Sequence, residues 1–464
     1  MLGTMSNVSE SLVKKYDVKT SYYTDYPPLG LWLDSYKDTD YIKSMEGLIA
    51  KKEREPLLLY LHFPYCPRLC TYCQCYHLIT QDRAKVKEFL AHLYIEINLL
   101  HIFFKKHSYK PLIKEIHLGG GSPSFLDTKE FDELIENLKK IVDFDELAEF
   151  TIEIDPRQVN RDRMVYYHEK GINRISFGVQ DFDPNVQKAV NRIQPPEMVA
   201  DLLVPEIRRL FKTVNFDIIY RLPLQTRESF RKTIDTVIKL SPDRIALCVL
   251  GYRPDIFKHQ RLLKESDIPE IYESTIIFIE AMQNLLDNGY LRIGLDHFAK
   301  PVDELGKALK NKTLHRNALG YTPGRYKDMI GIGPSSMAKI GDCYFQNEYL
   351  LDTYYSALKN NKFPILRGYR LNKDEIIRRE LMHKLLCYFS LNFKDIENKY
   401  QIDFKKYFKR ELDDLDEFVN EGIIELRGDS IISTEIGTLF LRHVCRVFDN
   451  LGMDYKHSRE TVKQ

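Results

Sequence analysis

Six short apolar segments alternate with longer amphipathic segments in the first half of this 464-residue chain. Each apolar segment has the length of a β-strand and is rich in branched and aromatic side chains. These segments are residues 57–63, 115–120, 150–155, 174–180, 214–220 and 244–250. The helices predicted between them cover 82–106, 128–142, 160–170, 196–211 and 227–240. Such alternation predicts parallel strands, because each return to the same edge of a sheet needs a crossover connection.

Six strand–helix units are too few for a closed eight-stranded barrel. The pattern therefore predicts an α/β fold with either an open partial barrel or a doubly wound sheet. Both folds place their chemistry at the carboxyl ends of the strands. Polar residues and glycines do occur at those ends or within the later strands, namely Cys66, residues 119–121, Glu153, Asp155, Gln180 and Asp217.

We expect four segments along the chain, of which the second contains these strands and helices. We expect an N-terminal extension over 1–55 that helps to cover the active site, the catalytic partial barrel over 56–300, and a barrel-closing segment and linker over 301–370. Residues 371–464 predict a helical, winged-helix-like domain, with helices at 374–389 and 404–420, a hairpin around Arg427-Gly428-Asp429 and a final helix. A winged helix often binds DNA, but the helix before this hairpin is acidic, which favours a packing or lid role.

The charge balance limits the kinds of partner that we expect. Lys plus Arg number 68 and Asp plus Glu number 67, so the net charge of +1 argues against binding to nucleic acid by bulk positive charge. The first residues lack the pattern of an export signal. The most apolar stretch, near residues 91–104, contains Glu96 and Asn98 and is too short to span a membrane. We expect a cytoplasmic protein that binds neither nucleic acid nor membrane.

Four of the eight cysteines fall within one ten-residue window, which is unlike the even spread of a disulfide framework. Cys66, Cys70 and Cys73 form C-x3-C-x2-C directly after the first predicted strand. Thiolates hold iron–sulfur clusters, and three ligands on one loop leave the fourth iron of a cubane cluster open. A zinc site completed by Cys75 and His77 and a set of ordinary buried cysteines are the alternatives. We expect only packing roles for the remaining cysteines, Cys248, Cys343, Cys387 and Cys445.

The C-x3-C-x2-C spacing resembles the hallmark of the radical S-adenosylmethionine superfamily. More closely, the chain resembles the oxygen-independent coproporphyrinogen III oxidases over nearly its whole length. The matching segments include LYLHFPYCPRLCTYCQC, GGGSPSFL, TIEIDPR, NRISFGVQDF, GLDHFA and LHRN. This resemblance implies a partial (β/α)6 radical-SAM barrel that carries a [4Fe–4S] cluster and S-adenosylmethionine.

In this family an electron from the reduced cluster splits S-adenosylmethionine into methionine and a 5′-deoxyadenosyl radical. That radical removes a β-hydrogen from a propionate of coproporphyrinogen III, and loss of carbon dioxide and one more electron leaves a vinyl group. The resemblance therefore implies a radical oxidoreductase of haem biosynthesis. Its partners would be a small tetrapyrrole-like substrate and a low-potential electron donor, and we expect a monomer.

The resemblance also assigns individual residues. Cys66, Cys70 and Cys73 are the expected cluster ligands, and Tyr60 and Glu153 are the expected catalytic residues. Cofactor contacts are expected from these two and from Tyr72, Gly120, Gly121, Ser122, Gln180, Arg192, Asp217, Gly251 and Met337. Taken alone, three glycines indicate only a turn, Tyr60 a core aromatic residue and Glu153 a salt bridge. Basic residues for the substrate carboxylates are Arg253, His297, Lys300, His315 and Arg316, for which surface or core roles are the alternative.

The chain also departs from the family pattern. Ala318 and Leu319 replace a phenylalanine and a glutamine that are associated with a second S-adenosylmethionine, which puts that second site in doubt. Arg221 replaces a glycine, where it would fill space near the cofactor or bind a new carboxylate. Residues 249–254 differ in the expected pocket wall, and Asp25 is an added acid near the N-terminus.

These departures leave three hypotheses for the function. The leading one is the oxidative decarboxylation of coproporphyrinogen III. The second is a paralogous radical enzyme that acts on another tetrapyrrole or aromatic substrate. The third is a haem-binding chaperone, against which the C-x-C formed by Cys73 and Cys75 argues, because chaperone relatives lack the second of these cysteines.

Overall fold

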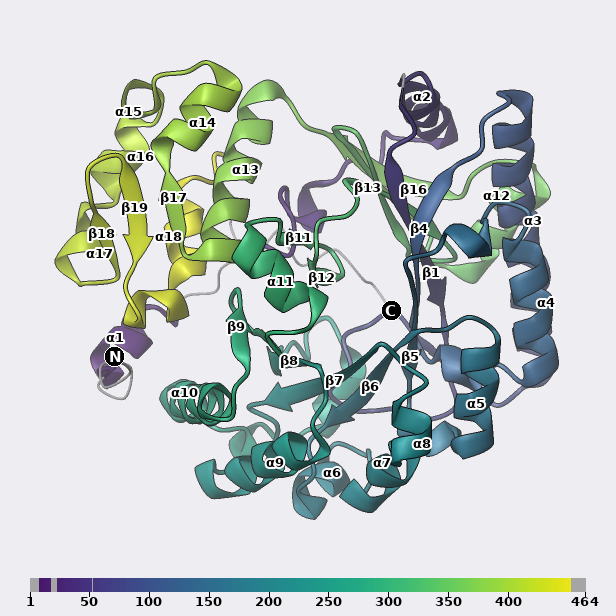
Figure 1. Cartoon of the computed structure of the whole chain (residues 1–464), viewed down its shortest axis with the longest axis horizontal. Coiled ribbons are helices and arrows are strands. Elements are labelled where there is room, and N and C mark those ends of the chain that lie inside the picture. Colours follow the sequence, from purple (N-terminus) through teal and green to yellow (C-terminus); the bar gives the residue numbers. More distant parts are fainter. Residues whose placement is uncertain (1–7, 18–22, 52, 452–464) are drawn as a thin grey trace.

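The computed structural model describes residues 8–17, 23–51 and 53–451 (Figure 1). Within them, one twelve-stranded sheet has the order β16-β15-β14-β13-β1-β4-β5-β6-β7-β8-β10-β9. All six predicted strands are present and lie side by side in parallel. They are β1 Pro56–Phe63, β4 Leu112–Gly120, β5 Glu149–Ile154, β6 Arg174–Gln180, β7 Thr213–Tyr220 and β8 Arg244–Val249. The prediction of an α/β fold with a parallel sheet is confirmed.

Further strands extend both ends of this parallel core. On the β1 side, β13 (Asp328–Ile332) pairs in parallel with β1. The antiparallel strands β14 (Met337–Ile340), β15 (Cys343–Asn347) and β16 (Ile365–Arg370) follow it. On the β8 side, β10 (His297–Ala299) and β9 (Leu291–Ile293) run antiparallel. In the described residues β16 and β9 are the two edges, so the sheet stays open as a partial barrel.

Helices follow the parallel strands and cover the outer side of the sheet (Figure 1). They are α3 Arg83–Lys106, α4 Thr128–Leu138, α5 Arg161–Glu169, α7 Pro196–Leu202, α8 Pro205–Arg208, α9 Arg227–Leu240 and α10 Ile271–Asp287. The single helix predicted over 196–211 is wrong. The chain breaks there because Pro205 has no N–H to donate and disfavours helical backbone at Val204, so two short helices form. No helix in the described part of the chain combines the length and apolar character needed to cross a membrane.

The C-terminal region combines helices with a three-stranded sheet on the open side of the barrel (Figure 1). The predicted hairpin forms from β18 (Ile424–Leu426) and β19 (Ser430–Ser433), and β17 (Ser390–Asn392) adds the third strand. The helix predicted over 404–420 is instead three short helices. The helices of this region are α13 Lys373–Tyr388, α14 Phe393–Tyr400, α15 Phe404–Tyr407, α16 Lys409–Asp414, α17 Asp416–Asn420 and α18 Leu441–Val447.

The described parts of the N-terminal extension contain α1 (Glu10–Lys15) and α2 (Asp38–Ile49). They are tied to the far end of the chain, since the Tyr23 hydroxyl donates to Asp449 at 2.9 Å and the Tyr26 hydroxyl to Asn450 at 2.8 Å. Most of this extension therefore packs as part of the folded molecule. The added acid Asp25 belongs to a segment that departs from the family, residues 22–27, and residue 22 lies outside the described residues.

A buried carboxylate on α3 braces the loop that follows β13. Glu96 accepts hydrogen bonds from Tyr354 Oη (2.5 Å), Asn347 Nδ2 (2.7 Å) and the Gly333 N–H (2.8 Å). A Cβ at Gly333 would lie 2.4 Å from the His62 carbonyl oxygen, so this loop packs directly on the end of β1. Burial raises the pKa of Glu96 to about 7, although the three donors favour the carboxylate.

We predict that Glu96 makes folding stability fall as the pH rises. Its folded pKa lies above the ordinary value of 4.5, so its contribution is fully present below pH 4.5 and is lost up to about pH 7. The loss should amount to about 3 kcal/mol in the free energy of unfolding, at 1.36 kcal/mol per unit of pKa. Urea unfolding across this window should show a flatter pH dependence for Glu96→Gln. Glu88→Gln, an exposed change on the same helix, should behave as wild type, and an unchanged slope in Glu96→Gln would contradict the prediction.

Candidate active site

A cavity of about 340 Å³, here called the central cavity, lies at the carboxyl ends of the parallel strands. Its lining runs from the cysteine loop after β1 to the segment that follows β8. All but two of the site residues that were assigned from the sequence line this cavity. Those that line it are Cys66, Cys70, Tyr72, Cys73, Gly120, Gly121, Ser122, Glu153, Gln180, Arg192, Asp217 and Gly251.

The two remaining residues, Tyr60 and Met337, lie in an apolar cluster beside the central cavity. Leu58, Tyr326, Met329 and Leu319 complete that cluster. Leu319 is one of the departures from the family pattern, so an apolar side chain packs here where the family has an amide.

The cysteine loop begins in β2 (Tyr65–Cys66) and returns to the fold through β3 (Leu78–Ile79). The Thr71 N–H donates to the Val190 carbonyl at 3.2 Å, which ties the loop to the segment after α6 (Pro184–Ala189). All three motif cysteines are free thiols. In the described residues no three His, Cys, Asp or Glu side chains converge on a single-ion site, whereas a cubane cluster takes its thiolates at separate iron corners.

Two arginines contact the middle cysteine of the motif. Arg157 Nη2 lies 3.5 Å and Arg192 Nη1 3.4 Å from Cys70 Sγ. Both lie beside Asp155, at 2.7 Å for Arg157 and 3.6 Å for Arg192. Burial alone would raise the pKa of Asp155, but the two guanidinium groups lower it to about 2. Two positive charges around one carboxylate leave a positive excess beside Cys70, which fits an anionic iron–sulfur cluster held by this loop.

Glu153 is held from two sides at the end of β5. His117 Nε2 lies 2.9 Å from its Oε1, and the Gly120 N–H donates to its Oε2 at 3.2 Å. A Cβ at Gly119 would come within 2.6 Å of Glu153 Oε1, so only glycine admits this carboxylate. His117 was not anticipated from the sequence. The available signal was its place on the strand before the glycines, next to the strand that carries Glu153.

A buried histidine fixes the orientation of the Tyr60 hydroxyl. His62 Nε2 lies 2.9 Å from the Tyr76 carbonyl oxygen, and His62 Nδ1 lies 3.0 Å from Tyr60 Oη. Burial lowers the pKa of His62 to about 4, so the ring is neutral near pH 7 and carries one hydrogen. A carbonyl only accepts, which places that hydrogen on Nε2. The Tyr60 hydroxyl therefore donates to Nδ1. Gly120 makes room for this ring, since a Cβ there would come within 2.6 Å of it.

Polar groups on β6 and β7 line the opposite wall of the central cavity. Asp217 accepts from Asn215 Nδ2 at 2.8 Å and from Ser176 Oγ at 3.1 Å. Burial and the nearby Glu153 raise its pKa. Gln180 has a left-handed backbone (φ 67°), and its buried Oε1 has no hydrogen-bond partner in the described structure. An orphaned acceptor in a cavity wall fits contact with a polar ligand such as the ribose of S-adenosylmethionine.

The structure corrects two predictions about individual side chains. Packing roles fit the buried Cys343, Cys387 and Cys445, but the packing role for Cys248 is wrong, because this cysteine is exposed and lines the central cavity. Arg221 does not line that cavity. Its Nε donates to the Pro269 carbonyl at 3.2 Å from a left-handed backbone (φ 68°).

None of the basic residues proposed for the substrate lines the central cavity. Lys300 is wrong for this role, because its Nζ donates to Ser241 at 2.9 Å and its N–H to Asp243, beside the amino end of β8. Arg316 and His297 both lie beside Asp296, at 3.8 and 2.8 Å. Arg253 pairs with Asp255 at 3.1 Å, and the His315 ring lies 4.4 Å from that of His383.

We predict that the three motif cysteines, and no others, hold the cluster. Replacing Cys66, Cys70 or Cys73 singly by alanine should reduce reconstituted iron from about four per chain to a small fraction, because each thiolate binds one iron corner. Iron analysis and visible absorption measure this loss. Cys75→Ala is the matched control, since its exposed thiol lies in the same loop and should leave the iron content unchanged. Equal iron loss in the control would contradict the assignment.

Comparison with known proteins agrees with the fold and shows the family. Residues 60–237 match the model of the radical SAM superfamily. The chain is 37% identical to the oxygen-independent coproporphyrinogen III oxidase of Pseudomonas aeruginosa, over 94% of this chain and 95% of that protein. It is 34% identical to the Escherichia coli protein of the same name, over 95% and 94%.

A solved structure of the Escherichia coli coproporphyrinogen III oxidase, described as a radical SAM enzyme, superimposes with a TM-score of 0.87. The match has 34% identity and covers 96% of this chain and 99% of the other. The same fold, full-length similarity and the cysteine loop at the barrel mouth lead to one conclusion. The chain belongs to the oxygen-independent coproporphyrinogen III oxidase family of the radical SAM superfamily.

Proposed function

We propose that this protein catalyses the oxygen-independent oxidative decarboxylation of coproporphyrinogen III, which converts two propionates to vinyl groups. One observation carries the proposal: the cysteine loop and all but two of the residues assigned to S-adenosylmethionine, which are far apart in the sequence, surround one cavity. When bound, the [4Fe–4S] cluster and S-adenosylmethionine supply the radical that removes a hydrogen from the propionate side chain. The full-length similarity to coproporphyrinogen III oxidases supports this substrate over another tetrapyrrole.

The assigned residues have different roles in binding the cluster and the cofactor. Cys66, Cys70 and Cys73 hold the cluster. The Nε and Nη2 groups of Arg192 donate to the Gly178 carbonyl, at 3.2 and 2.6 Å. Its Nη1 group therefore remains to contact the cluster and the carboxylate of the cofactor. Glu153, already fixed by His117 and the Gly120 N–H, presents its carboxylate to the amino side of the cofactor.

The remaining assigned residues orient the cofactor. Gln180 and Asp217 present oxygen atoms that suit ribose hydroxyls, and Tyr72 offers a ring for the adenine. Gly120, Gly121, Ser122 and Gly251 let the backbone approach closely. Tyr60 and Met337 reach the cofactor from the apolar cluster beside the cavity. The four divisions of the chain at 1–55, 56–300, 301–370 and 371–464 remain our assignment. We also propose a cytoplasmic monomer that binds neither nucleic acid nor membrane, which the near-zero net charge supports.

The direct test uses the anaerobically reconstituted protein with S-adenosylmethionine, dithionite and coproporphyrinogen III. Chromatography should detect 5′-deoxyadenosine together with harderoporphyrinogen and protoporphyrinogen. Cofactor cleavage without these products would favour the paralogue that uses another substrate. Haem binding with no cleavage would favour the chaperone. Cys70→Ala is the matched inactive control.

We predict that the wild-type protein binds about one S-adenosylmethionine per chain, because the Leu319 side chain has no hydrogen-bonding atom where the family has a side-chain amide. Equilibrium dialysis of the cluster-loaded protein measures this ratio. Leu319→Gln restores the amide and should raise the ratio toward two, whereas Leu319→Met, which keeps an apolar side chain, should leave it unchanged. A wild-type ratio of two would show that the second site survives the substitution.

A further inference from the structure

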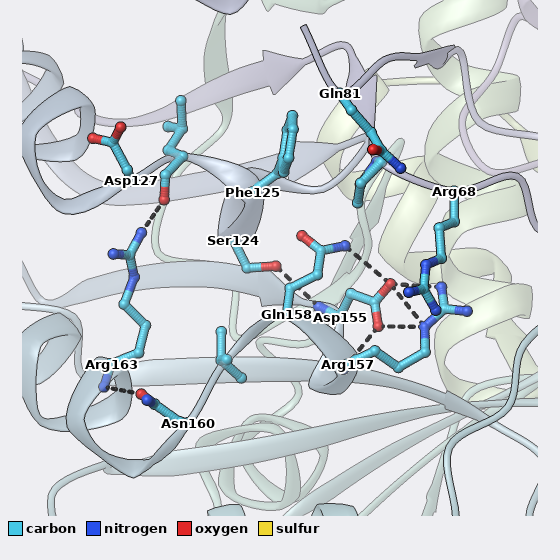
Figure 2. Close-up of a pocket in the computed structure, with 13 residues that line it drawn as sticks. Arg68, Gln81, Ser124, Phe125, Asp127, Asp155, Arg157, Gln158, Asn160 and Arg163 are labelled. Carbon is cyan, nitrogen blue, oxygen red and sulfur yellow. Dashed lines mark hydrogen bonds and ion pairs between the residues drawn. The ribbon is translucent and has the colours of Figure 1, made fainter. Parts of the chain in front are cut away.

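A second and more open cavity lies on the outer side of the cysteine loop (Figure 2). This outer cavity has a volume of about 660 Å³. Pro67 and Arg68 of the cysteine loop line it, together with the segment after β4 and the segment between β5 and α5. It takes no part in the cofactor contacts proposed above, although it lies next to them.

Only one layer of side chains separates the outer cavity from the central cavity. Arg68, Asp155 and Arg157 line both. In Figure 2 Asp155 lies between Arg157 and Gln158, with Arg68 alongside. The Arg157 side chain is 9% exposed, and its Nη2 lies 3.5 Å from Cys70 Sγ. A redox group seated in the outer cavity would thus be one guanidinium away from an expected cluster ligand. Electron transfer slows steeply with distance, so this is a short entry route to the cluster.

The uncompensated charge around the outer cavity is positive. Arg68 is exposed and makes no hydrogen bond or ion pair within the described part of the chain. Arg163 donates to the Leu126 carbonyl and lies over tyrosine rings, with no carboxylate in ion-pair distance among the described residues. The acids at the cavity are already paired, since Asp127 lies 3.4 Å from Arg83 and Asp155 lies beside Arg157.

We propose that the outer cavity is the docking surface for the electron donor, a small flavoprotein whose exposed flavin edge is surrounded by acidic side chains. The proposal rests on the proposed function, which requires a low-potential reductant. The acidic face of the donor pairs with Arg68 and Arg163, and Phe125 offers an apolar contact for the ring. The anionic flavin hydroquinone loses one electron and becomes the neutral semiquinone. The cluster gains that electron, and no bond breaks and no proton moves.

The test measures reduction of the reconstituted cluster by stopped-flow absorbance, with reduced flavodoxin as the probe. Arg68→Glu should slow this reduction and weaken flavodoxin binding by about tenfold at low ionic strength, with a smaller effect in high salt. Fluorescence anisotropy of labelled flavodoxin measures the binding. Arg410→Glu is the matched control, because its side chain is 91% exposed on α16 in the C-terminal region, and it should match wild type.

A small neutral reductant, the photogenerated deazaflavin radical, separates docking from effects on the cluster itself. It should reduce wild type and Arg68→Glu at equal rates. Equal slowing with both reductants, or no slowing with flavodoxin, would overturn the proposal. Gln81→Glu adds a negative charge at the same rim without changing the cysteine loop, and should also slow flavodoxin alone. Normal reduction by flavodoxin without tetrapyrrole product would instead count against the proposed function, so the two failures are distinguishable.

Discussion

The ends of β1, β4 and β5 fit together because no side chain stands between them at Gly119 and Gly120. Glu153 lies against the backbone at Gly119, and the His62 ring fills the space beside Gly120. A methyl group at either position would displace the carboxylate or the ring. The Tyr60 hydroxyl, through His62, and the Glu153 carboxylate both take their positions from these contacts. The site therefore depends on close packing of strand ends more than on any single ion pair.

Much of the barrel could be predicted because its signals are local. Each core strand is a short apolar segment, and the cysteine motif lies on a loop directly after the first of them. The parallel pairing of β13 with β1 could not be predicted, since their residues lie about 270 positions apart and no local pattern links them. Lys300 was misplaced for a related reason. Lys300 directly follows the short antiparallel strand β10, and the sequence does not reveal that the end of this strand lies beside the amino end of β8.

The contacts between side chains in the site were harder to predict from the sequence than the strands. His117 and His62 each act on a predicted residue, but neither belongs to a motif that predicts such a partner. Cys248 was assigned to packing because it is isolated in the sequence, whereas it lies near the end of β8, beyond the buried part of the strand, and lines the central cavity. The local placement of charged side chains also explains how a chain with a net charge of +1 can have a site that favours an anionic group. Arg157 and Arg192 share one carboxylate beside Cys70, so a positive excess exists there although the whole chain is nearly neutral.

Three of the departures from the family pattern, Asp25, Ala318 and Leu319, lie close together, apart from Arg221 and residues 249–254. Asp25 and Ala318 line a narrow pocket of about 40 Å³ together with Met337. Asp25 pairs with Arg379 at 2.9 Å, so the added acid neutralises a buried cation. Leu319 packs beside Tyr60 in the adjoining apolar cluster. The cysteine loop and its arginines keep the family pattern while this neighbouring region has lost an amide and gained a paired acid. That distribution fits an enzyme that retains the radical chemistry and has changed what lies next to it.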